Sequence, residues 1–164
     1  MVLPRRPNGI PTVHTDWQIN ELPLPGPLIR LISSSRWRHP GDWALRQLTP
    51  WLDDPLDFMT TIDELRLHNR LIAQLDADTM QFFQIGRGSA GQPIAMPWLD
   101  LDQAVFIAVC RYAGDDIAVT LDYRTSPTDP RVLATDTATI AQQHLSWRQV
   151  TPTLSQFINA LHLH

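Results

Sequence analysis

The chain of 164 residues has 17 acidic and 13 basic side chains, a formal net charge of −4, and 43% hydrophobic residues. This balance argues against a nucleic-acid-binding protein, which needs a basic surface, and the longest apolar run, residues 104–110, is too short to cross a bilayer. Every basic residue is an arginine, which excludes a lysine Schiff base and the lysine of a P-loop. One cysteine and no apolar leader predict a cytoplasmic protein without a disulfide.

The first half of the chain predicts an arm followed by helices. Six prolines before residue 28 predict an extended arm over residues 1–22 and a single domain over residues 23–164. Short helices are expected at residues 27–34 and 43–48, the second capped by Asp42. A longer helix is expected from residue 61 to 75, because Thr61 and Glu64 have the spacing of a capping box.

From residue 80 the hydrophobic period becomes that of strands. Candidate strands cover residues 80–86 and 92–98, the second at an edge or broken because it contains two prolines. The best strands are residues 104–112 and 116–123, joined by a tight turn, and shorter ones are expected at 132–135 and 146–150. A last helix is expected with Thr151 as its N-cap and Pro152 as its first residue. Helices, then strands, then a helix predict an α+β fold: a mainly antiparallel sheet flanked by helices at both ends.

Several motifs resemble catalytic, cofactor or metal sites. GRGSAG at residues 86–91 matches GxGxxG, but the prolines that follow exclude the helix that a dinucleotide site needs, so a hairpin loop that could touch a partner is the better interpretation. Cys110 is interpreted as a buried, inert thiol, the histidines lack zinc-site spacing, and no cofactor is expected. Asp115, Asp116 and Asp122 lack the pattern of a calcium loop. They are interpreted as turn and strand residues or as an acidic protein-binding surface.

The tryptophans are expected mainly in the core. Trp147, on a short strand before the last helix, is expected to be buried. Trp37 lies between two arginines, so an exposed ring or one stacked on guanidinium groups is expected there. Trp43 and Trp51 follow the default of core packing.

The segment GDDIAVTLDYRTSPTDPRV at residues 114–132 resembles the glycine-turn and "LD" segment of the SUKH superfamily, the Smi/Knr-like domain. SWRQV and TLSQF, at residues 146–150 and 153–157, resemble the terminal Trp-containing strand and Phe-containing helix of that family. Leu22-Pro23 or Leu24-Pro25 could supply its LP motif, whereas residues 33–35 are serines where the family has a glycine. The resemblance covers residues 24–163.

The resemblance implies a non-enzymatic α+β domain. Bacterial members are mostly immunity proteins that neutralise toxins, commonly nucleases, and eukaryotic relatives are protein-interaction modules. We therefore expect a protein partner such as a toxin nuclease, no nucleic acid and no membrane, with occlusion aided by charge complementarity. Asp115, Asp116, Asp122 and Arg124 are expected at the partner surface, and the oligomeric state is left open. The alternatives are a small-ligand-binding or enzymatic domain that uses the 86–91 loop, and a regulatory scaffold protein without a toxin partner.

Overall fold

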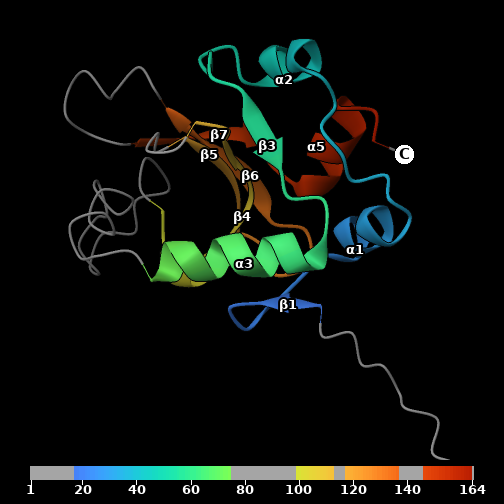
Figure 1. The fold of residues 1–164 in the computed structure, drawn as a ribbon, viewed down its shortest axis with the longest axis vertical. Helices are drawn as coiled ribbons and strands as arrows, with labels where there is room; N and C mark the ends of the chain where they lie inside the picture. Colours follow the sequence, from blue (N-terminus) through green and yellow to red (C-terminus); the bar gives the residue numbers. More distant parts are fainter. Residues whose placement is uncertain (1–16, 75–98, 113–116, 137–145, 164) are drawn as a thin grey trace, which may run out of the picture.

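The computed structural model describes residues 17–74, 99–112, 117–136 and 146–163 (Figure 1). Within these ranges, a five-stranded antiparallel sheet has the order β3-β4-β5-β6-β7, and a two-stranded hairpin, β1-β2, precedes it. Helices precede and follow the sheet in the sequence, so the expected α+β class is confirmed. The elements in chain order are β1 (Gln18–Ile19), β2 (Leu22–Pro23), α1 (Gly26–Ser33), α2 (Asp42–Leu48), β3 (Leu56–Phe58), α3 (Ile62–Ala73), η1 (Leu101–Gln103), β4 (Ala104–Cys110), β5 (Ala118–Asp122), β6 (Arg131–Asp136), β7 (Ser146–Thr151) and α5 (Leu154–Ala160).

Strands β4, β5 and β6 form the middle of the sheet and are buried along nearly their whole length. Val, Ile and Leu dominate them because such side chains pack well on a pleated, covered surface. The register of β4 against β5 shifts between Phe106 and Ala108, which marks a β-bulge. The four predicted strands after residue 103 are confirmed, and those predicted at residues 80–86 and 92–98 lie outside the described residues.

Helix α3 has the predicted capping box, in which Thr61 Oγ1 accepts from Glu64 N at 3.1 Å and Glu64 Oε2 accepts from Thr61 N at 3.1 Å. The helix contacts β4. There the polar Asn69 is 2% exposed, and its side chain exchanges two 2.9 Å hydrogen bonds with the N–H and C=O of Phe106. Backbone contact from the β3 side ends with Met59 N, which donates to Ile107 O at 3.1 Å, and the Asn69 amide bonds the next residue of β4, Phe106.

Local predictions at two helix starts are wrong. Asp42 is the first residue of α2 and Gly41 is its N-cap, without a side-chain cap hydrogen bond. Thr151 ends β7 instead of capping α5; the N-cap is Thr153, which accepts from Gln156 N at 3.2 Å, and Pro152 therefore precedes the helix. A threonine lies on each side of that proline. Because β7 extends to the first of them, the second becomes the N-cap.

The tryptophans divide between core and surface. Trp37 is 1% exposed with its ring centroid 5.2 Å from that of Phe58, so the prediction of an exposed ring is wrong. Trp147 is 2% exposed and lies edge-on to Phe106, as predicted for a core residue. Trp43 on α2 is 76% exposed, against the expectation of core packing.

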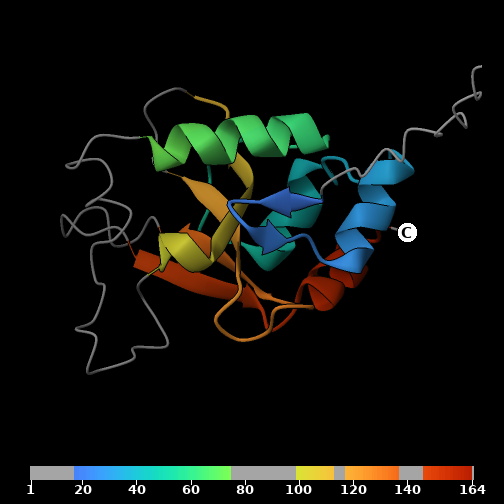
Figure 2. The same cartoon turned by 90° about the horizontal axis from the view of Figure 1, so that it is seen from below.

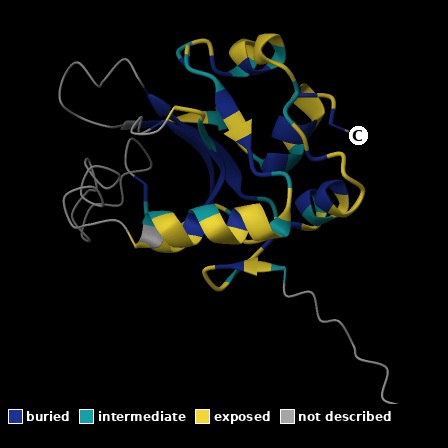
Figure 3. Cartoon of the chain, in the orientation of Figure 1, coloured by how far each residue is buried: buried dark blue, intermediate teal, exposed yellow. Residues whose placement is uncertain are grey.

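The region of the predicted arm includes the hairpin β1-β2, and residues 1–16 lie outside the described residues. The hairpin is tied to the domain by the buried Ile19 and by Tyr123, whose hydroxyl donates to the Pro23 carbonyl at 3.0 Å. Figure 3 shows a buried sheet and an exposed outer side of α3. In the described part of the chain, no helix is long and apolar enough to span a membrane.

Candidate functional site

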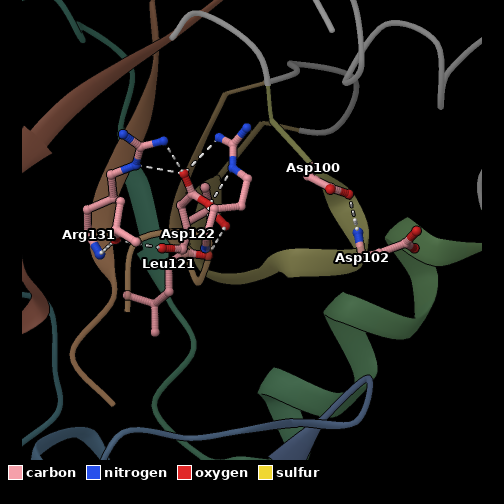
Figure 4. A network of polar contacts seen from close by, with 8 residues as sticks. Asp100, Asp102, Leu121, Asp122 and Arg131 are labelled. Carbon is pink, nitrogen blue, oxygen red and sulfur yellow. Dashed lines mark hydrogen bonds and ion pairs between the residues drawn. The ribbon is translucent and has the colours of Figure 1, made fainter. Parts of the chain in front are cut away.

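A polar cluster at the end of β5 joins Asp122, Arg124 and Arg131 (Figure 4). Asp122 Oδ2 accepts from Arg131 Nε and from Arg124 Nη2, both at 2.7 Å, and Oδ1 accepts from Arg124 Nε at 2.8 Å. The carboxylate side chain is 0% exposed, and those of Arg124 and Arg131 are 16% and 10% exposed. One buried carboxylate is therefore shared by two largely buried guanidinium groups, which leaves the cluster with one excess positive charge.

The environment of this carboxylate sets its protonation. Burial alone would raise the pKa of Asp122, but hydrogen bonds from Arg124 and Arg131, together with their charges, lower the pKa below its ordinary value. The group is ionised at neutral pH and its oxygens are occupied by the arginines. Its role in this geometry is to hold the two arginines in place.

The turn that follows β5 is connected to the cluster and to α5. Thr125 Oγ1 lies 3.4 Å from both the Asp122 carbonyl and the Arg131 N–H. At the other end of the turn, Asp129 Oδ1 accepts from Ser155 N at 2.9 Å in the first turn of α5. The predicted polar turn is thus a fixed link between the sheet and the last helix.

The four residues predicted at a partner surface do not form one described surface. Asp115 and Asp116 lie outside the described residues, and Asp122 and Arg124 belong to the buried cluster. A partner at this segment would meet Arg124 rather than the Asp122 carboxylate, and the partner role of all four stays a prediction. Sequence reasoning missed Arg131, because the register that places it opposite Asp122 becomes evident only when β5 and β6 pair.

A second group of polar and aromatic residues lies where β4 ends, next to the predicted acidic turn. Arg111 Nε donates to Asp57 Oδ1 at 2.9 Å, with both side chains more than half exposed. The hydrogen bond and charge of Asp57, with a further contribution from the charge of Asp42, raise the pKa of Arg111. Tyr112, the next residue, is 58% exposed. Asp42 and Pro55 line one small cavity, and Arg111 N donates to Pro55 O at 2.9 Å, so the start of α2 is near the end of β4.

Helix α2 completes this surface. Trp43 is 76% exposed, and Asp42 Oδ1 lies 3.5 Å from His39 Nε2. In Figure 1 the helix lies beside the start of β3, the strand that carries Asp57. We call the surface formed by these residues the α2–β4 surface: Asp42, Trp43, Asp57, Arg111 and Tyr112.

A cavity of about 470 Å³ adjoins the α2–β4 surface and gathers titratable side chains from three elements, among them His39, Glu64, His68 and Cys110. Cys110 is a half-buried thiol whose Sγ accepts from Tyr112 N at 3.4 Å, so it is less buried than expected. In the part of the chain that the structure describes, no three His, Cys, Asp or Glu side chains are arranged to hold a metal ion. The 86–91 loop lies outside the described residues.

Comparisons of the chain with family models, with curated proteins and with solved structures give no match. The SUKH resemblance therefore stays a prediction. The function of the chain has to be inferred from the chemistry of the described residues.

Proposed function

We propose that this chain is a non-enzymatic protein-binding domain that acts by occluding its partner, as an immunity protein does when it covers a toxin. The observation that carries the proposal is that two aromatic side chains of the α2–β4 surface are exposed, Trp43 at 76% and Tyr112 at 58%. The Arg111–Asp57 ion pair belongs to the same surface. Single exposed apolar residues are ordinary on protein surfaces. Trp, Tyr and Arg together, however, are the residues that dominate binding hot spots.

The charge of the chain favours a basic partner. The net charge is −4, and Asp115 and Asp116 follow Tyr112 closely in the sequence. An acidic surface steers a basic partner and accelerates its association. A toxin nuclease carries a basic surface to bind its substrate, so it is the partner class that this charge complements best.

Two carboxyl groups with shifted pKa values, Asp122 and Glu64, are unsuited to acid catalysis. A general acid that works near neutral pH needs a carboxyl with a raised pKa. Asp122 and Glu64 instead have lowered pKa values, because hydrogen bonds to their ionised forms outweigh the effect of burial, which alone would raise them. Both carboxylates stabilise the fold, one in the buried cluster and the other in the capping box.

Calorimetry with the partner protein, obtained by affinity capture from a cell lysate, tests this proposal. Replacing both aromatic residues, Trp43→Ala with Tyr112→Ala, should weaken the complex by at least about 30-fold, because each hot-spot aromatic contributes more than about 1 kcal/mol. The matched control is Leu67→Ala with Leu71→Ala, which removes two exposed apolar side chains from α3, away from α2 in Figure 1. Unchanged affinity of the folded Trp43/Tyr112 variant would overturn the assigned surface.

A further inference from the structure

The groove between α1 and α5 forms a cavity of about 480 Å³. The two helices lie side by side in both Figure 1 and Figure 2. Helix α1 lines the groove with the face that carries Arg30, Leu31 and Ser34, and α5 lines it with Ser155, Ile158 and Asn159. These positions follow the three- and four-residue spacing of one helix face.

Both helices end in the same backbone motif, and each motif returns the chain to this groove. After α1, Ser35 N donates to Ile32 O at 3.0 Å and Arg36 N donates to Leu31 O at 2.8 Å, with Ser35 at φ 55°. This pair of bonds with a left-handed residue is a Schellman motif. It places Arg36 next to Leu31 at the mouth of the groove.

Helix α5 repeats the arrangement. His162 N donates to Asn159 O and Leu163 N donates to Ile158 O, both at 3.1 Å, with His162 at φ 54°. The motif folds Leu163 back against the groove, where it is 6% exposed. The residue that follows each motif, Arg36 after α1 and Leu163 after α5, thus lines the groove.

The groove is lined by two arginines and by several apolar side chains. Arg30 and Arg36 line it, none of the described lining residues is a carboxylate, and neither guanidinium has an ion pair or a side-chain hydrogen bond with another described residue. The guanidinium of Arg30 lies back along the first turn of α1, since its Nη1 is 3.4 Å from where a Cβ on Gly26 would lie. Below the arginines, Leu31, Ile158 and Leu163 are each buried to more than nine-tenths.

We propose that this groove binds an amphipathic anion, with its oxyanion held by the guanidinium groups that line the groove, those of Arg30 and Arg36, and its apolar body lying on Leu31, Ile158 and Leu163. Guanidinium groups bind carboxylates and phosphates through paired hydrogen bonds. Two exposed arginines that line one groove therefore offer an oxyanion two sets of guanidinium donors. A carboxylate or a phosphate monoester on an alkyl or aryl body has this chemistry. The site is separate from the α2–β4 surface and does not depend on the proposed partner.

An NMR titration of the full chain tests the proposal with three probes: octanoate, octyl phosphate and octan-1-ol. Octanoate or octyl phosphate should shift the Ile158 and Leu163 methyl signals and the Arg30 and Arg36 side-chain signals saturably, with a Kd below about 1 mM. The acid that binds more tightly identifies the carboxylate or the phosphate as the preferred head group. Octan-1-ol should bind at least about tenfold more weakly, since it lacks the charge for the arginines.

Variants separate this site from general binding of anions to the surface. Arg30→Gln and Arg36→Gln keep most of the aliphatic stem and should each weaken binding at least about fivefold. Arg38→Gln, an exposed arginine outside the groove, removes the same charge and should leave binding unchanged. The proposal is overturned if neither octyl acid gives saturable shifts in this range, if octan-1-ol binds equally well, or if Arg38→Gln weakens binding as much as the groove variants.

Discussion

Asp122 and Arg131 face each other across β5 and β6, and Arg131 Nε donates to the fully buried Asp122 carboxylate at 2.7 Å. The carboxylate is 0% exposed to solvent, so hydrogen bonds from the two arginines replace its hydration. The segment that sequence reasoning assigned to partner binding therefore contains a structural cluster.

Removing the buried carboxylate should strongly destabilise the protein. Asp122→Ala removes the carboxylate that Arg124 and Arg131 share, and both arginines are largely buried; loss of one partner of a buried ion pair costs about 3–5 kcal/mol. Urea denaturation measures this change in the free energy of unfolding. Asp57→Ala is the matched control: its ion pair with Arg111 is more than half exposed on both sides, so a loss of about 1 kcal/mol or less is expected. Equal losses in the two variants would contradict the assigned role of the cluster.

The same carboxylate should make stability depend on acid pH. The pKa of Asp122 is lower in the folded protein than in the unfolded chain, where it is about 3.9. The unfolded state therefore binds the proton more readily, so the stabilisation is complete above the unfolded pKa and is lost as pH falls through the folded pKa. Urea midpoints measured from neutral pH downwards should fall more steeply below about pH 4 for the wild type than for Asp122→Asn. Parallel curves for the two proteins would refute this assignment.

The buried amide of Asn69 should be essential for the junction of α3 and β4. Asn69→Leu leaves the N–H and C=O of Phe106 without the side-chain partner that bonds both, at an expected cost of about 2–4 kcal/mol in the free energy of unfolding. Leu71→Ala on the exposed side of the same helix should change stability by about 0.5 kcal/mol or less. A neutral Asn69→Leu variant in thermal or urea denaturation would show that these hydrogen bonds are replaceable.

Neighbouring serines at the end of α1 should respond oppositely to glycine. Ser35 has φ 55°, a left-handed conformation that L-residues other than glycine adopt at a cost, so Ser35→Gly should stabilise the protein by about 0.5–1 kcal/mol. Ser33 is the last residue of the helix, and Ser33→Gly should destabilise it by about 0.5 kcal/mol. Thermal denaturation of the two variants tests the pair. Destabilisation by both would contradict the left-handed assignment.

Strong local signals explain which parts of the fold could be predicted from the sequence. Helix α3 carries a capping box, and β4 and β5 are rich in Val and Ile and joined by a turn sequence, so their existence followed from local chemistry. The strand β3 could not be predicted, because its three residues are too few to show a period of two. The burial of Trp37 was missed for another reason: its arginine neighbours suggested exposure, whereas contact with Phe58 decides it.

The candidate sites were less predictable, because each depends on contacts between distant elements. The spacing of Asp116 and Asp122 suggested one acidic face, but strand register instead places Asp122 opposite Arg131. The α1–α5 groove joins residues more than a hundred positions apart, such as Arg36 and Asn159, and no local pattern relates them. The exposure of Trp43 likewise depends on how α2 packs, which its short sequence does not determine.

The central claim is that this domain acts by binding another protein. The most direct test is affinity capture with the tagged, folded full chain from a lysate of the cells that produce it, read by mass spectrometry and by the mass of the purified complex. The account predicts one stoichiometric partner with a basic surface, captured by the wild type and by the Leu67/Leu71 variant but lost with the Trp43/Tyr112 variant. Absence of any stoichiometric partner from repeated captures of folded protein would contradict it.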